Sequence, residues 1–130
     1  NNKVTSNSNW HTVGSVHGKL KFKALNAADA IIIPSIHEPF GIVGLEALAA
    51  KKAIPIASFT DGLGSFLNKT NAIEIKEPIS PNSIENAIKN WVNMRSKEKR
   101  IMKGRGHKTA KTFNWKRTAN KIKAVYKSLL

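Results

Sequence analysis

Three short apolar runs, separated by glycine-marked loops and helix-length segments, constrain the fold of this chain more than any other feature. They lie at residues 30–34, 54–57 and 72–75. The first run is β-branched and does not alternate with polar residues, which is typical of a strand buried on both faces of a parallel sheet. The second is another strand candidate, and the third, which contains Glu74, is a weaker one. With helices between them, the runs predict an α/β fold: a partial doubly wound parallel sheet with right-handed crossovers and a helical C-terminal tail.

Further elements are predicted around these runs. Residues 13–16 are predicted as the remnant of a strand, and Leu20, Ala24 and Ala27 as one apolar face of the first helix. Pro55 lacks a ladder donor, so we expect an irregular or edge strand there. The segments predicted to be helical are 19–28, 42–51, a short helix after the turn at 60–64, the helix that Ser80 and Pro81 open, 94–113, and a last helix capped by Asn114.

The two C-terminal helices carry further signals. Gly104 and Gly106 are predicted to interrupt the helix at 94–113. The last helix has an apolar stripe whose members step at four and three residues, which is the spacing of one helical face. We predict that this stripe packs against a core. Its residues are Trp115, Ala119, Ile122, Tyr126 and Leu129.

The chain is strongly basic, with 22 Lys and Arg against 8 Asp and Glu and a formal net charge of +14. Residues 89–130 hold 14 of the basic residues, and Glu98 is their only acid. A solvated outer face, a nucleic acid and an anionic membrane are the alternatives. Nucleic acid is disfavoured, because aromatic residues are only 7% and Trp115 and Tyr126 lie in the apolar stripe. A membrane is not indicated, because the basic residues of the last helix are not confined opposite its apolar face.

Length and composition exclude several classes. A chain of 130 residues allows one domain, and we take residues 1–130 as a single domain with a frayed end at 1–12 and a helical tail at 80–130. Without cysteine there is no disulfide scaffold, thiol nucleophile or Cys-ligated metal. No apolar run approaches the roughly 20 residues of a membrane span, and the polar start is no signal peptide. We expect a cytoplasmic protein.

The loop after the first predicted strand carries the chemistry. Ligands of such sheets bind beyond the carboxyl ends of the strands, where the loops at 35–41 and 59–64 should meet. Gly41 opens a helix, so the amides of Gly41, Ile42 and Val43 should be unpaired and form an anion site for a phosphate or diphosphate. Glu46 could accept hydrogen bonds from a ribose, and Glu38 lies beside the group that the phosphate carries. These residues predict a nucleotide-sugar-like ligand.

The two carboxylates also have structural interpretations, which the residues alone leave equally open. Glu46 could be a first-turn acid matched to the helix dipole, and Glu38 could be a capping carboxylate. The histidines add little: His37 precedes Glu38 in the loop, and the remaining three show no metal-ligand spacing. We therefore predict no metal site.

The segment 34–47, PSIHEPFGIVGLEA, resembles the E-x7-E signature of retaining glycosyltransferases with two Rossmann domains, the GT-B type. It is most similar to glycogen and starch synthases and to the group 1 (GT4-like) transferases. Residues 28–35 resemble the "ADxxxxPS" strand of the family, and 53–58 with Gly62-Leu63 its "IPIAS…GGL" segment. Phe113-Asn114-Trp115 is similar to its "FSW". The resemblance covers about residues 13–130.

The resemblance implies a Rossmann-like, donor-binding domain of a hexosyltransferase. It implies a nucleotide-sugar donor, ADP-glucose or UDP-glucose. The glucosyl group of this donor would be transferred with retention to an α-glucan or another glycan, without metal or cofactor. Glu38 would contact the donor sugar and Glu46 the ribose. The backbone at Phe40, Gly41, Ile42 and Val43 would hold the sugar and distal phosphate, with the turn from Thr60 to Gly62 near the phosphates.

The departures from the family pattern have consequences. Lys51-Lys52 stands where the family has glycine after the helix, and Asp61 replaces the first Gly of "GGL". The acceptor-binding N-terminal Rossmann domain and the basic pair that neutralises the diphosphate would lie upstream. We therefore expect a fragment that is inactive alone. The alternatives are a basic module that binds RNA or another polyanion, and a group 1 transferase acting on lipid or polysaccharide acceptors.

Overall fold

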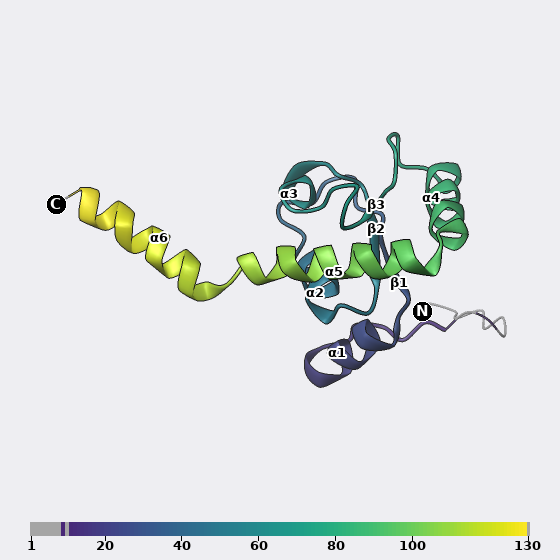
Figure 1. Ribbon diagram of the computed structural model, residues 1–130, viewed down its shortest axis with the longest axis horizontal. Coiled ribbons are helices and arrows are strands. Elements are labelled where there is room, and N and C mark those ends of the chain that lie inside the picture. Colours follow the sequence, from purple (N-terminus) through teal and green to yellow (C-terminus); the bar gives the residue numbers. More distant parts are fainter. Residues whose placement is uncertain (1–8, 10, 130) are drawn as a thin grey trace.

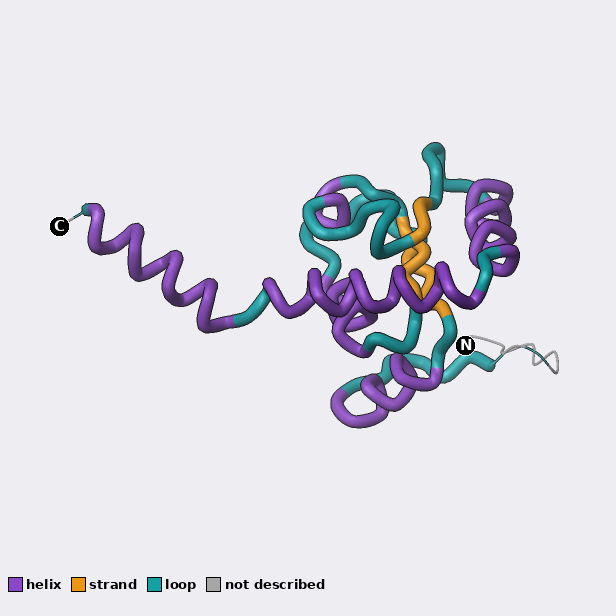
Figure 2. Tube along the Cα trace, viewed as in Figure 1, coloured by secondary structure: helices purple, strands orange, loops and turns teal. Residues whose placement is uncertain are grey.

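The computed structural model describes residues 9 and 11–129, and it confirms an α/β fold with a helical C-terminal part (Figures 1 and 2). The predicted frayed end at 1–12 lies almost wholly outside the described residues. The elements are α1 (Gly18–Ala27), β1 (Ala30–Ile33), α2 (Ile42–Ala50), β2 (Ile54–Ala57), α3 (Asp61–Gly64), β3 (Ile73–Glu74), α4 (Pro81–Asn93), α5 (Ser96–Thr112) and α6 (Trp115–Ser128).

The three strands form a parallel sheet in the order β1-β2-β3. The prediction of an edge or irregular strand at Pro55 is wrong, because β2 is central and regular. The Ile54 amide donates to the Asp29 carbonyl on the β1 side. Because successive residues of a strand direct their N–H groups to opposite neighbours, the N–H that Pro55 lacks would face β3. β3 begins only at Ile73, opposite Ile56, so no ladder bond is lost where proline lacks its N–H.

Helices cover both faces of the sheet and divide the core into two clusters. Ile33 and Ala57 pack with Leu48 of α2 and Leu63 of α3 on one face. On the other face, the isoleucines of β2 and β3 pack with Ala87 of α4. α5 crosses between the two, because Met102 contacts the second cluster and Ala110 the first. The long helix thereby ties the two layers together (Figure 1).

The N-terminal part differs from prediction at three points. Residues 13–16 form no strand. In α1 the buried residue is Leu25, whereas Leu20 is exposed, because α1 packs on α2 through the line of Lys21 and Leu25. β2 is buried on both faces, but Ile32 of β1 is 43% exposed because β1 is an edge strand within the described chain.

Two of the three C-terminal helices begin as predicted, whereas α5 begins at Ser96 and not at Met94. Ser80 caps α4 by accepting a hydrogen bond from the Ser83 amide at 3.1 Å, and Asn114 caps α6 through the Arg117 amide at 2.9 Å. The predicted interruption of α5 is wrong, since the helix runs unbroken from Ser96 to Thr112. Gly106 instead allows close packing, because a Cβ there would lie 2.6 Å from Leu48 Cδ2.

The prediction that the stripe of α6 packs against a core is also wrong. α6 projects from the body, and none of its described residues is buried (Figure 1). Trp115 is 87% exposed. Among the described residues, no helix is long and apolar enough to cross a membrane.

Candidate functional site

The loops that follow β1 and β2 lie against each other, as predicted. The Ser58 hydroxyl donates to the Ser35 carbonyl at 2.9 Å, and the Gly62 amide donates to the Glu38 carbonyl at 2.9 Å. A Cβ on Gly62 would lie 2.2 Å from the Pro39 oxygen and 2.3 Å from Phe40 Cα. Only glycine therefore allows the two loops to meet at this distance.

Gly41 is the N-cap of α2 and has a left-handed backbone, with φ at 81°. The expectation that its amide is unpaired is wrong, because it donates to Glu38 Oε1 at 3.2 Å. Glu38 is thus a capping carboxylate, as one of its two interpretations predicted. The other carboxylate oxygen of Glu38 accepts a hydrogen bond from the Ser35 hydroxyl at 3.4 Å. Within the described residues the amides of Ile42 and Val43 have no hydrogen-bond partner. These two amides at the start of α2 are free to donate to an anion.

Glu46 lies on α2 one turn beyond these amides. Its interpretation as a first-turn acid is wrong, because α2 begins at Ile42 and has no acid in its first turn. Lys21 of α1 pairs with Glu46 Oε1 at 2.6 Å, and the two side chains are 32% and 21% exposed. Glu46 Oε2 is buried without a hydrogen-bond partner. Glu46 Oε2 keeps its acceptor capacity, but protein atoms enclose it, so a ligand hydroxyl would reach it only after a local rearrangement.

The second loop places Thr60 and Asp61 beside the first. The Thr60 hydroxyl donates to Ser58 Oγ at 3.2 Å, close to the point where the loops meet. Asp61 has a φ of 49°, and its carboxylate lies 3.3 Å from Nδ1 of His37. The acid that replaces a family glycine therefore has a partner in the site loop itself.

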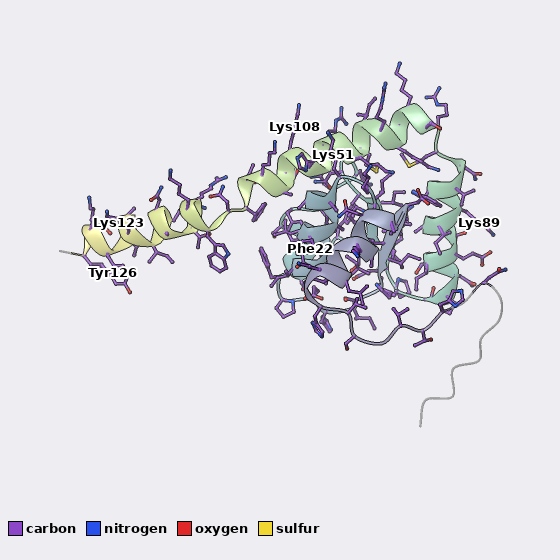
Figure 3. The ribbon with its side chains drawn as sticks, turned by 90° about the horizontal axis from the view of Figure 1, so that it is seen from below. Phe22, Lys51, Lys89, Lys108, Lys123 and Tyr126 are labelled. Atoms are coloured by element: carbon purple, nitrogen blue, oxygen red, sulfur yellow. The ribbon has the colours of Figure 1, made fainter. Side chains whose placement is uncertain are left out.

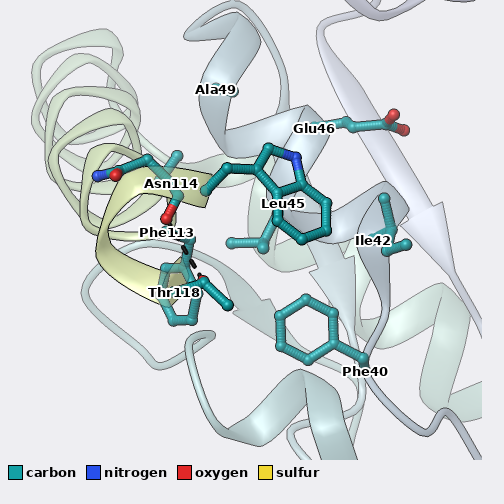
Figure 4. Close-up of a pocket in the computed structure, with 10 residues that line it drawn as sticks. Phe40, Ile42, Leu45, Glu46, Ala49, Phe113, Asn114 and Thr118 are labelled. Atoms are coloured by element: carbon teal, nitrogen blue, oxygen red, sulfur yellow. Dashed lines mark hydrogen bonds between the residues drawn. The ribbon is translucent and has the colours of Figure 1, made fainter. Parts of the chain in front are cut away.

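An aromatic hollow lies beside the carboxylates and was not predicted. The rings of Phe40, Phe66 and Phe113 pack with centroids 5.6 to 6.2 Å apart. The hollow measures about 510 Å³, and the Glu46 carboxylate points away from its aromatic rings (Figure 4). Its lining residues are Phe40, Ile42, Leu45, Glu46, Ala49, Ala110, Phe113, Asn114, Trp115 and Thr118. No group of three potential metal ligands occurs in the described part of the chain.

Comparisons with known proteins identify the family. The model for "Glycosyl transferases group 1" matches residues 4–108, which is most of the chain. The chain belongs to the group 1 glycosyltransferases. Its fold is also that of a GT-B enzyme: sucrose-phosphate synthase from Thermosynechococcus elongatus superposes with a TM-score of 0.70 and 28% identity, over 82% of this chain and 26% of that one.

Curated relatives of this glycosyltransferase chain come from an archaeon. "Uncharacterized glycosyltransferase MJ1607" from Methanocaldococcus jannaschii is 29% identical over 115 residues, covering 88% of this chain and 29% of the relative. "Uncharacterized glycosyltransferase MJ1178" from the same organism is 27% identical over 99 residues, covering 76% of this chain and 28% of the relative. The chain thus spans less than a third of the length of these relatives.

Sequence reasoning missed three residues of this site. Lys21 carries no local signal, because its partner Glu46 is 25 positions away. Ser35 and Ser58 follow the two strands at comparable positions, and this placement alone could have marked them.

Proposed function

We propose that this chain is the donor-binding part of a retaining glycosyltransferase. The observation that carries the proposal is the arrangement around the start of α2. Two unpaired amides, at Ile42 and Val43, lie between the Glu38 carboxylate and the partly buried Glu46 carboxylate. Helix amides favour a phosphate, and the carboxylates favour hydroxyl groups on either side of it. A nucleotide sugar has this order of groups: ribose, diphosphate, sugar.

In this proposal each residue has a role in binding the donor. The Ile42 and Val43 amides hold the distal phosphate, and stabilise the charge that develops on it as the glycosidic bond breaks. Glu46 accepts from a ribose hydroxyl through Oε2, which a local rearrangement must first uncover, while Lys21 keeps Oε1. Glu38 contacts the donor sugar, and the backbone of Phe40 and Gly41 approaches it. Thr60 and Gly62 lie on the neighbouring loop, near the phosphates.

The finer assignment is glucosyl transfer from ADP-glucose or UDP-glucose to an α-glucan, as in glycogen and starch synthases. The likeness of residues 34–47 to those enzymes supports it, and a solved relative is a sucrose-phosphate synthase. The acceptor would bind to an N-terminal Rossmann domain of the complete enzyme. We propose that neither a metal nor a cofactor takes part.

Calorimetric titration of the complete enzyme with ADP-glucose and with UDP-glucose tests this function. Glu46→Gln should weaken donor binding by about tenfold or more, because one hydrogen bond from a ribose hydroxyl to a charged carboxylate contributes about 1.5–3 kcal/mol. Glu85→Gln is the matched control, since Glu85 is an exposed carboxylate on α4 that pairs with Lys89. An unchanged donor affinity in Glu46→Gln would refute the ribose site.

A further inference from the structure

A second hollow, of about 420 Å³, lies where the end of α2 meets the first turns of α5. Five cations and one hydroxyl line it, and no carboxylate does. Figure 3 shows one of them, Lys51, beside α5. The lining residues are Lys51, Lys52, Ser96, Lys99, Arg100 and Lys103.

This basic hollow is distinct from the donor site. The donor site lies at the start of α2, whereas Lys51 and Lys52 follow its last residue, Ala50, and precede β2. α2 has 9 residues, so its two ends are about 13 Å apart at a rise of about 1.5 Å per residue. The hollow is thus at the amino edge of the sheet, and the donor diphosphate binds at the carboxyl edge.

No carboxylate among the described residues pairs with the cations of the hollow, so ion pairing does not explain their clustering. The ion pairs between described residues involve none of the five. Glu98, the one acid of α5, pairs with Arg95 at 2.6 Å and does not line the hollow. Lys99 and Lys103 are four residues apart on a helix, a spacing at which like charges repel.

Helix dipoles account for only one of these positions. Lys51 is the C-cap of α2, where a cation is favourable, although its φ of 60° is the left-handed region that favours glycine. Lys99 and Arg100 instead lie near the N-terminus of α5, where the dipole disfavours a cation and favours an anion. An anion in the hollow would be attracted by both the side chains and the helix end.

One cation is held in position. Lys99 Nζ lies 4.3 Å from the centroid of the Trp91 ring and donates to the Val92 carbonyl at 3.4 Å. Lys99 covers the ring, and Trp115 and Tyr126 lie on α6, which does not line the hollow. The hollow therefore offers no free aromatic face for stacking a base, which disfavours single-stranded RNA as its ligand.

We propose that the basic hollow binds a compact oligophosphate, a ligand group that carries two or more phosphates close together. Five cations around one hollow match the charge of such a group, and Ser96 supplies a hydroxyl donor. The same chemistry occurs in a free oligophosphate and in the headgroup of a polyphosphorylated lipid. The oligophosphate would bind at the end of α2, and the donor at its start.

The test uses the full chain with two probes: sodium tripolyphosphate in calorimetry, and phosphatidylcholine vesicles with about 5% phosphatidylinositol bisphosphate in sedimentation. The variant Arg100→Gln/Lys103→Gln removes two cations of the hollow. The matched control, Lys97→Gln/Lys108→Gln, removes two exposed lysines from the same helix that do not line it. Both variants change the net charge equally.

The hollow variant should bind at least one probe about tenfold or more weakly than the parent, whereas the control should stay within about twofold. Loss confined to tripolyphosphate identifies a free oligophosphate, and loss confined to vesicles identifies the lipid headgroup. An equal loss in both variants, or no binding of either probe by the parent, overturns the proposal. The probes lack the ribose that the donor site requires, so failure here leaves the Glu46 experiment unaffected.

Discussion

Gly62→Ala should separate the two loops that build the donor site. The new Cβ would lie 2.2, 2.3 and 2.4 Å from the Pro39 oxygen, the Phe40 Cα and the Pro39 carbonyl carbon. All three are backbone atoms, which cannot turn away as a flexible side chain can. The loops would have to move apart by about 1 Å to restore ordinary contacts.

The cost follows from two changes. Forcing a methyl group into a packed contact costs about 1–3 kcal/mol. The separation also breaks the 2.9 Å hydrogen bond from the Gly62 amide to the Glu38 carbonyl, which contributes about 1 kcal/mol. Gly62→Ala should thus lower the free energy of unfolding by about 2–4 kcal/mol, and donor affinity should fall because Glu38 shifts with its loop.

Urea denaturation followed by circular dichroism measures this change. Gly104→Ala is the matched control, because a Cβ on Gly104 in α5 meets nothing within 4 Å. Alanine there should raise the free energy of unfolding by about 0.5–1 kcal/mol through helix propensity. The two substitutions should therefore change the free energy of unfolding in opposite directions. A loss below about 1 kcal/mol in Gly62→Ala, or an equal loss in Gly104→Ala, would refute the close-contact argument.

Two further predictions concern charged pairs. Lys21→Met should weaken donor binding several-fold, but less than Glu46→Gln, because it frees the Glu46 carboxylate to turn from the ribose. The control Lys23→Met, on the exposed side of α1, should leave the affinity measured by calorimetry unchanged. Equal effects of the two substitutions would contradict this prediction. Hydrogen bonds from the Arg95 side chain and backbone lower the pKa of Glu98. The pair therefore stabilises the folded state at a pH above the ordinary carboxyl pKa, and this stabilisation is lost as the pH falls through the lowered pKa of Glu98. An NMR titration should show that Arg95→Met raises the pKa of Glu98, and an unchanged value would disprove the pairing.

The sequence predicted those parts of the fold that depend on local patterns. Apolar runs located the strands, and the polar side chains of Ser80 and Asn114 located two helix starts. It failed where tertiary contacts decide. Pro55 is accommodated because β3 begins late beside it, and Gly106 serves a contact with Leu48, 58 positions away, that no local pattern contains. The amphipathic stripe of α6 predicted burial, but amphipathicity does not specify which surface covers it.

The candidate site shows the same division. The glycines and carboxylates of residues 38–46 indicated an anion beside two carboxylates that accept hydrogen bonds from hydroxyl groups. Capping by Glu38 was one of the interpretations that the sequence offered, but the pairing of Glu46 with Lys21 could not be predicted. Glu38 uses one oxygen to cap Gly41, and Glu46 uses one to pair with Lys21. Each carboxylate retains acceptor capacity, so a structural role does not exclude the proposed binding role in the same residue. At Glu38 the structure shows the capping contact, and its role in donor binding stays a prediction.

The positive charge of the chain is also divided by the fold. A strongly basic chain could be expected to bind an anionic ligand through lysine and arginine, yet the two loops of the candidate site carry the carboxylates of Glu38 and Asp61. In the proposed function the nearest donors to the diphosphate are backbone amides, and these do not attract unrelated polyanions over long distances. The clustered cations lie at the opposite end of α2, around the basic hollow. We therefore propose that the two ends of α2 differ, with a ligand selected by geometry at its start and by charge at its end. Raising the salt concentration should therefore weaken oligophosphate binding far more steeply than donor binding.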